Sequence, residues 1–158
     1  MSEDWIKELL SSFQDQITKG TYEAIYSLDG EARDHIMRSQ ATACVHAFVD
    51  LFAIPKELDL DGFLEHMKYG GSSKVDIRRE NDTIEFIERH EGECMCPLVK
   101  RDAARLTPQL CDCAVHWLRM LVQRHTDKPV AVELVESVAT GARDCTFRIR
   151  LGTRMLPE

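Results

Sequence analysis

Cysteine is the residue type in this sequence that offers the most chemistry. Four of the six cysteines form two C-x-C pairs, Cys94 with Cys96 and Cys111 with Cys113. Thiolates bind zinc and iron–sulfur clusters, and two chain segments that each supply two ligands can close a four-coordinate site. We therefore predict that Cys94, Cys96, Cys111 and Cys113 bind zinc or an iron–sulfur cluster.

Two other interpretations of the cysteines stay open. C-x-C is less typical of zinc sites than C-x₂-C, so the thiols could serve redox or nucleophilic chemistry, or pack in a core. A thiolate at a helix N-terminus has a lowered pKa, which favours Cys111 and Cys113 for either chemistry. Cys145 alternates with Phe147 in an apolar pattern and Cys44 lies in a helical stretch, so packing is the simpler explanation for both.

A small-ligand pocket is expected between the helix that follows Cys113 and the C-terminal sheet. We predict ligand contacts from Trp117, His116 and Cys145, with Cys113 at the border. Backbone N–H groups and the dipole at a helix N-terminus favour a thiolate or an anionic ligand there. The alternative for Trp117 is that it fills the core, and the sequence assigns no catalytic residue.

The first part of the chain, residues 1–70, has helical patterns that must position these groups. Apolar residues share one face of a first stretch, from Asp4 to about Thr18, which Gly20 would end: Trp5, Ile6, Leu9, Leu10, Phe13 and Ile17. A longer pattern follows from Glu31 to Ala53, and a shorter one around Leu60 to Met67 ends at the glycine-serine joint 70–73.

The second part, residues 74–152, contains two alternating hairpin patterns and one helix. The hairpins span about Val75–Ile87 and Val130–Leu151, and the helix between them begins near Cys111. Residues after Gly152 are expected to fray. This order predicts one α+β domain over residues 1–158, in which the N-terminal helices pack on an antiparallel sheet.

Composition and charge limit the classes of partner. With 44% apolar and 30% charged residues the chain is typical of a globular protein, and its net charge of −7 argues against a nucleic-acid-binding surface. No apolar run approaches the roughly 18 residues that cross a bilayer. We expect a cytoplasmic protein with a small molecule or metal ion as partner and no nucleic acid or membrane, and the sequence is compatible with a homodimer.

The C-terminal two fifths resembles a group of poorly characterised bacterial and archaeal proteins. The matching residues are C-x-C-P at Cys94–Pro97, L-C-x-C at Leu110–Cys113 with Trp117, the P-V-x-V-E-L-x-E-S segment 129–137, and the closing G…C-x-F-x-I at 141–149. The closing element is also similar to the ends of the 4-vinyl-reductase-like small-molecule-binding domain and of the L-2-amino-thiazoline-4-carboxylic acid hydrolase family. This resemblance implies an α+β fold related to the haem-nitric-oxide-binding and vesicle-tethering folds, with a small ligand between helices and sheet.

Two functions follow as hypotheses. The first is a small-ligand- or metal-binding domain in which the two C-x-C pairs hold the metal. The alternative, implied by the hydrolase resemblance, is a ring-opening C–N cleavage in which one of Cys94, Cys96, Cys111 or Cys113 is the activated nucleophile. That alternative needs a base, and the sequence identifies none.

Overall fold

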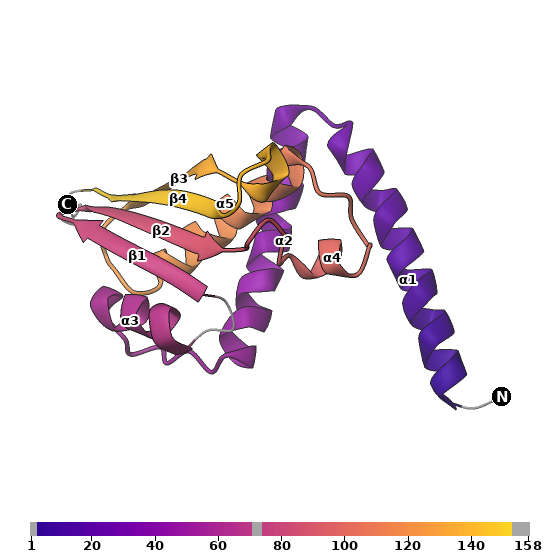
Figure 1. The fold of residues 1–158 in the computed structure, drawn as a ribbon, viewed down its shortest axis with the longest axis horizontal. Coiled ribbons are helices and arrows are strands. Elements are labelled where there is room, and N and C mark those ends of the chain that lie inside the picture. Colours follow the sequence, from indigo (N-terminus) through magenta and orange to yellow (C-terminus); the bar gives the residue numbers. More distant parts are fainter. Residues whose placement is uncertain (1–2, 71–73, 153–158) are drawn as a thin grey trace, which may run out of the picture.

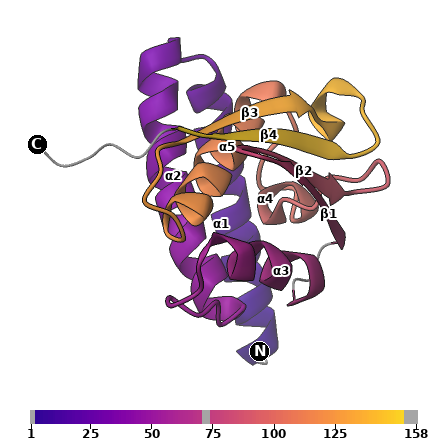
Figure 2. The same ribbon diagram turned by 90° about the vertical axis from the view of Figure 1, so that its left-hand side faces the viewer.

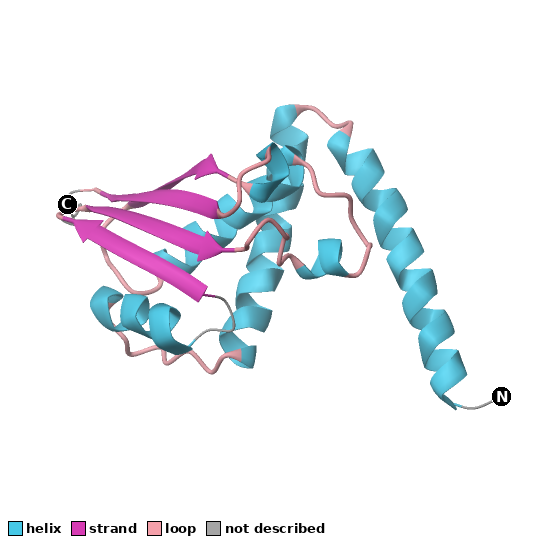
Figure 3. Cartoon of the chain, in the orientation of Figure 1, coloured by secondary structure: helices cyan, strands magenta, loops and turns pink. Residues whose placement is uncertain are grey.

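The computed structural model describes residues 3–70 and 74–152. The chain forms α1 (Glu3–Tyr26), α2 (Gly30–Leu51), α3 (Leu60–Gly70), β1 (Lys74–Glu80), β2 (Thr83–Arg89), α4 (Pro97–Lys100), α5 (Pro108–Gln123), β3 (Val130–Glu136), the 3₁₀ turn η1 (Val138–Thr140) and β4 (Cys145–Leu151) (Figures 1 and 3). Most of the predicted joint at 70–73 and the tail after Gly152 lie outside the described residues. The α+β class and both predicted hairpin segments are confirmed.

The strands form one antiparallel sheet in the order β1-β2-β4-β3. The two hairpins join at its centre, where β2 pairs with β4 and Phe86 lies opposite Phe147. Asn81 turns the first hairpin with a positive φ of 55°, a conformation that asparagine tolerates better than most residues. At the end of the central pair Glu88 lies opposite Cys145, so the sheet places that thiol at the edge nearest the cysteine-bearing loop.

The sheet has one face covered by helices and one face rich in charge. Helix α5 lies against β3, α3 lies against β1, and α2 packs on α5 (Figure 2). Phe86, Phe147 and Leu118 are fully buried between these layers. The other face carries ion pairs such as Arg148 Nη1 with Glu133 Oε2 at 3.3 Å. Alternation along the strands therefore separates core from charged surface, as it does in two-layer antiparallel folds.

The predicted packing of the N-terminal helices on the sheet is right for α3, which lies against β1, whereas α2 packs on α5 and the apolar face of α1 is exposed. Val45 and Val49 of α2 belong to the main core. In contrast, the six large apolar residues of the first stretch are all exposed. The helix also continues past Gly20, because Tyr22 and Ile25 in its last turns are buried against the domain. That burial outweighs the cost of about 1 kcal/mol for a glycine inside a helix.

Helix α5 begins one turn earlier than the sequence indicated. Thr107 is its N-cap, and the Thr107 hydroxyl accepts a hydrogen bond from the Leu110 amide at 3.2 Å. Pro108 occupies the first helical position, where the absence of an N–H is tolerated. Cys111 therefore lies at the end of the first turn, and Cys113 faces inward as a buried residue in the second.

Candidate functional site

The six cysteines are free thiols that come from four segments of the chain. Cys44 lies in α2, Cys94 and Cys96 in the loop between β2 and α4, Cys111 and Cys113 in α5, and Cys145 at the start of β4. The fold brings these segments together around the N-terminal half of α5. The thiols there interact in two overlapping groups, and Cys96 and Cys111 connect one group to the other.

The Cys113 group consists of Cys44, Cys96 and Cys113. Burial, with smaller contributions from the nearby thiols of Cys44 and Cys96, raises the pKa of Cys113 to about 12. Burial likewise raises the pKa of Cys44, again with a contribution from Cys96. The ring of Tyr22 adjoins this group, and its hydroxyl donates a hydrogen bond to Oε1 of Gln40. Of the three cysteines only Cys113 is buried in the apolar interior between α1, α2 and α5, while Cys96 is partly exposed and Cys44 is exposed.

The Cys145 group consists of Cys94, Cys111 and Cys145. Burial raises the pKa of Cys111 to about 12, and the sulfurs of Cys145 and Cys94 are the next largest causes. Burial also raises the pKa of Cys94. The direction is opposite to the lowered thiol pKa expected at a helix N-terminus, because burial penalises the charged thiolate. At neutral pH Cys94 and Cys111 are neutral thiols.

His90 and Glu88 lie beside the Cys145 group, and neither is among the site residues predicted from the sequence. Nε2 of His90 lies 3.2 Å from Oε2 of Glu88, and the His90 side chain is only 6% exposed. The sulfur of Cys145, then the Glu88 carboxylate, raises the pKa of His90 to about 10. Among the described residues, Nδ1 of His90 is buried without a hydrogen bond of normal geometry. The strand alternation that places residues 88 and 90 on one face was the available sequence signal.

Asp144 anchors the loop that carries Cys94 and Cys96. Its carboxylate accepts hydrogen bonds from Nη1 of Arg89 at 2.8 Å and from the backbone amides of His90 at 2.9 Å and Glu91 at 3.2 Å. The Arg89 hydrogen bond is the largest cause that lowers the pKa of Asp144 to about 2. The start of the loop is thus held to the start of β4, next to Cys145.

The two aromatic residues predicted to contact a ligand have protein partners in the structure. Trp117 packs edge-on against Phe48 with ring centroids 5.0 Å apart. It contacts both the main core and the smaller apolar cluster that contains Tyr22 and Ile25. Its buried Nε1 has no hydrogen-bond acceptor among the described residues. Nε2 of His116 lies 2.7 Å from Oδ1 of Asp34. Ligand binding by Trp117, His116 and Cys145 stays a prediction.

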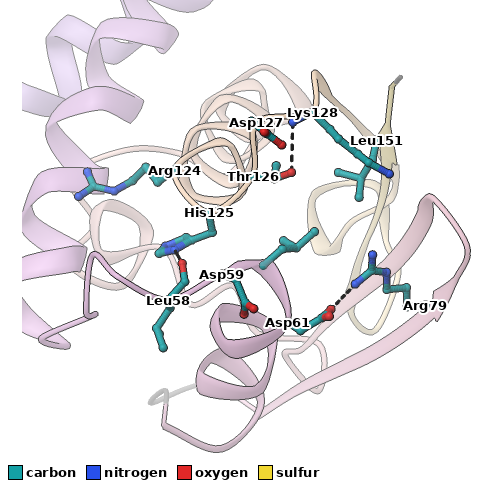
Figure 4. A pocket seen from close by; sticks show the side chains of 11 residues that line it. Leu58, Asp59, Asp61, Arg79, Arg124, His125, Thr126, Asp127, Lys128 and Leu151 are labelled. Atoms are coloured by element: carbon teal, nitrogen blue, oxygen red, sulfur yellow. Dashed lines mark hydrogen bonds and ion pairs between the residues drawn. The ribbon is translucent and has the colours of Figure 1, made fainter. Parts of the chain in front are cut away.

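A cavity of about 610 Å³ lies at the opposite end of α5, between α3 and the sheet edge (Figure 4). Charged side chains line it, including Arg79, Arg124 and Lys128 with Asp59 and Asp61. Leu58, Leu60, Thr126, Asp127, His125 and Leu151 complete the lining. Neither Cys113, Trp117 nor His116 lines this cavity.

His125 is the buried polar residue of this cavity. It is 7% exposed, and its ring stacks on Phe63 with centroids 4.4 Å apart. Nδ1 donates a hydrogen bond to the Leu58 carbonyl oxygen at 2.8 Å, so Nε2 is the acceptor in the neutral ring. Nε2 has no partner among the described residues. The His125 ring is therefore fixed in the wall of the cavity, with Nε2 buried behind the charged groups that line it.

The two ends of α5 have different chemical capacities. The cysteine end gathers soft sulfur donors and an imidazole, which is the donor set of zinc and related ions. Within residues 3–70 and 74–152, however, no group of three or more His, Cys, Asp or Glu side chains is arranged to hold a metal ion. No helix in the same residues is long and apolar enough to cross a membrane.

Comparison with known proteins identifies a shared fold and no family. No family model matches the chain, and no curated protein matches it in sequence. A trafficking protein particle complex subunit 3 from Naegleria fowleri, covalently bound to palmitic acid, is similar over 98% of this chain and 100% of that one, with 12% identity and a TM-score of 0.52. An H-NOX protein from S. oneidensis in the Fe(II)NO ligation state is similar over 77% of this chain and 66% of that one, with 12% identity and a TM-score of 0.50.

A third solved structure is less similar. The phenol-responsive sensory domain of the transcription activator PoxR, with phenol, matches over 90% of this chain and 73% of that one, with 17% identity and a TM-score of 0.45. The first two comparisons establish that the chain has a small α+β fold also found in a trafficking complex subunit and an H-NOX protein. The 4-vinyl-reductase-like arrangement within that fold stays a prediction.

Proposed function

We propose that this chain is a small-ligand-binding domain that binds a thiophilic metal ion, such as zinc, through Cys94, Cys111, Cys145 and His90. This set keeps two of the four predicted cysteines and exchanges Cys96 and Cys113 for Cys145 and His90. What supports the proposal is that the thiols of Cys145 and Cys94 both act electrostatically on Cys111, and that His90 interacts with Cys145 and Glu88. Sulfur and imidazole nitrogen are the ligands that zinc prefers.

Metal binding at this site would require deprotonation of its ligands. The pKa of Cys111 is about 12 and that of His90 is about 10, so both groups carry their protons at neutral pH. Because metals bind thiolates and neutral imidazole, binding should release protons and depend steeply on pH. The loop that carries Cys94 would close on α5 as the ligands reach bonding distance, and the Asp144 anchor would limit that movement to the loop beyond Glu91.

Titration calorimetry with Zn²⁺ in buffers of different ionisation enthalpy tests this proposal. We expect one ion per chain and release of more than one proton for each ion bound. Cys111→Ser and Cys145→Ser should each lower the affinity at least tenfold, whereas Cys44→Ser and Cys113→Ser should keep it. If Cys113→Ser abolishes binding while Cys145→Ser does not, the metal belongs to the two C-x-C pairs. If the parent protein binds no stoichiometric metal, the proposal is wrong.

The cavity at the other end of α5 is our candidate for the organic ligand. Its volume of about 610 Å³ falls in the range of small-molecule sites, roughly 300–1,000 Å³. Small ligands named with two proteins of this fold, palmitic acid and Fe(II)-bound NO, support the ligand-binding part of the proposal. The charged lining favours a small polar molecule that carries charged or hydrogen-bonding groups.

A matched pair of arginine variants tests this second site. Arg124 lines the cavity, whereas Arg119 is an exposed arginine of the same helix outside the lining. A thermal-shift panel of small hydroxy acids, amino acids and phenols should yield binders that lose affinity in Arg124→Ala and retain it in Arg119→Ala. Equal effects of both substitutions, or chemical-shift changes confined to the cysteine end, would contradict the assignment.

A further inference from the structure

Helix α1 is the element whose packing is hardest to explain in a single copy of the chain. It spans 24 residues along the side of the molecule away from the sheet (Figure 1). Its last turns pack on the domain through the apolar side chains of Tyr22 and Ile25. Its earlier turns contact the domain through ion pairs: Lys19 Nζ lies 2.8 Å from Asp102 Oδ2, and Arg101 Nη2 lies 3.1 Å from Asp15 Oδ1. In these earlier turns the polar side of the amphipathic helix therefore faces the domain.

The apolar side of α1 faces solvent. Six large apolar side chains are 43% to 63% exposed, and Phe13 has the highest value: Trp5, Ile6, Leu9, Leu10, Phe13 and Ile17. At about 3.6 residues per turn, this stripe and the domain-facing residues Ser11, Asp15 and Tyr22 lie on opposite sides of the helix. Rotation of α1 about its axis would bury the stripe but would break its ion pairs with residues 101 and 102.

The exposed stripe has the spacing of a helix-pairing seam. Ile6, Leu10, Phe13 and Ile17 are separated by four, three and four residues, which is the a/d repeat of helices that pack side by side. Gly20 and Ala24 continue the same repeat with small side chains. A helix that packs on the sheet of its own domain usually has a broader apolar face. A narrow a/d stripe is typical of a helix that packs on one other helix.

The size of the stripe matches the requirement of a modest dimer. Large side chains at about half exposure leave on the order of 80–100 Å² each in contact with water, so the stripe covers roughly 500 Å². Two such faces with their polar rims would bury about 1,200 Å² in total, the lower end of stable protein interfaces. Patches of this size are uncommon on monomers and usually mark an interaction site.

The acidic residues of α1 indicate what kind of partner its apolar side can bind and how two paired helices would be oriented. Glu3, Asp4 and Glu8 concentrate acid near the start of α1, and the whole chain carries a net charge of −7. Acidic flanks disfavour an anionic lipid surface as the partner. A parallel pair of α1 helices would place these acids side by side, whereas an antiparallel pair separates them and aligns the helix dipoles favourably.

We propose that the chain forms a two-fold symmetric dimer in which α1 packs antiparallel against α1 of a second copy. Centred on the stripe, this pairing places Ile6 opposite Ile17 and Leu10 opposite Phe13 of the other copy. Each apolar contact then occurs twice, as a two-fold axis requires. The domains lie on the outer sides of the helix pair, since each α1 binds its own domain through the opposite face.

Light scattering coupled to size exclusion of the full chain tests the dimer. The parent should be dimeric, and Leu10→Glu and Phe13→Lys should each raise the dissociation constant by at least about 100-fold, because each substitution acts twice. Circular dichroism should show parental helix content, since neither side chain is buried in its own domain. Leu51→Glu, at a 77% exposed leucine of α2, is the matched control and should leave the dimer intact.

Mixing the two variants tests the antiparallel direction. In an antiparallel pair, Glu at position 10 of one copy meets Lys at position 13 of the other, and the remaining Phe13 and Leu10 meet each other. The mixture should therefore regain dimers that neither variant forms alone, whereas a parallel pair gives no rescue. A monomeric parent, an unaffected Leu10→Glu variant, absence of rescue, or binding of the parent to phosphatidylserine vesicles in place of self-association would overturn the proposal.

Discussion

The two ends of α5 offer a ligand opposite kinds of chemistry. At the N-terminal end, Cys111 belongs to a group of three cysteines, and burial raises the pKa of the Cys111 and Cys94 thiols so that both are neutral at pH 7. At the C-terminal end, Arg124 and His125 line a cavity with charged and hydrogen-bonding groups. Both ends contain a buried histidine side chain: His90 interacts with Glu88 and Cys145 at the first end, and His125 donates to the Leu58 carbonyl at the second.

The difference between the two histidines shows how neighbours determine what a buried imidazole can bind. His90 lies between a carboxylate and a sulfur, and its raised pKa of about 10 keeps it protonated until a metal or a base removes the proton. His125 is held by Phe63 and by the Leu58 carbonyl, so its ring has a fixed position. The first arrangement suits a metal that displaces protons, and the second gives the cavity a rigid wall.

The largest expected effect comes from the middle of α5, which connects the two ends. Leu118 is fully buried in the main core. Leu118→Ala should lower the free energy of unfolding by about 2–5 kcal/mol through lost burial and a cavity. Urea unfolding of the parent and the variant measures this. If both sites depend on α5, Leu118→Ala should lower the affinity for metal and for the cavity ligand together. Loss of binding at only one of the two sites would show that they are independent.

The next largest effect is expected at only one end of α5, the end that contains the cysteines. Cys111→Ser should lower zinc affinity about 10–100-fold, because it removes a ligand from the proposed set. Cavity binding and the unfolding midpoint in the absence of metal should change little. Competition with a chromophoric zinc chelator gives the affinity, and Arg119→Ala serves as a surface control on the same helix. Parental affinity in Cys111→Ser would contradict the role of this thiol.

A smaller effect is expected from the N-cap of α5. The Thr107 hydroxyl accepts from the Leu110 amide in a buried position. Thr107→Ala should lower the free energy of unfolding by about 1 kcal/mol, and hydrogen exchange should quicken in the first turn near Cys111 more than near Arg124. Thr107→Ser keeps the acceptor and should restore slow exchange. Uniform quickening along α5 would indicate that the two ends are not locally distinct.

The smallest effect concerns the Asp144 anchor and its pH dependence. Because Arg89 lowers the pKa of Asp144 from 3.8 to about 2, the ionised carboxylate favours the folded state. This stabilisation is fully present above pH 3.8 and is lost as pH falls toward about 2. Asp144→Asn should therefore be less stable than the parent at neutral pH, with a difference that shrinks in acid. A difference that is constant with pH would contradict the ion pair's role.

The sequence predicted the elements of the fold better than their packing. The β1–β2 and β3–β4 hairpins follow from period-two alternation, and α5 follows from a strong apolar face. A similar apolar face in α1 led to the wrong prediction that this helix packs on the sheet. Periodicity shows that a helix face is apolar, but it does not show what covers that face. The pattern around Phe13 is that of a buried helix, yet the residue faces solvent.

The candidate site was predictable in part. The clustered cysteines drew attention to the correct end of α5, but the electrostatic consequence was wrong for Cys111, since burial depends on tertiary packing that spacing does not report. His90 was overlooked because its relation to Cys145 arises only from the pairing of β2 with β4. The cavity near His125 unites α3, α5 and two strands, and no local motif marks it.

X-ray absorption at the zinc edge, on protein loaded with one equivalent of zinc, tests the central claim most directly. Metal binding by Cys94, Cys111, Cys145 and His90 predicts a shell of three sulfur atoms at about 2.3 Å together with one nitrogen at about 2.0 Å. The sulfur count should fall in Cys145→Ser and stay unchanged in Cys113→Ser. A spectrum with only oxygen and nitrogen neighbours, or one that Cys145→Ser leaves unaltered, would contradict the proposed site.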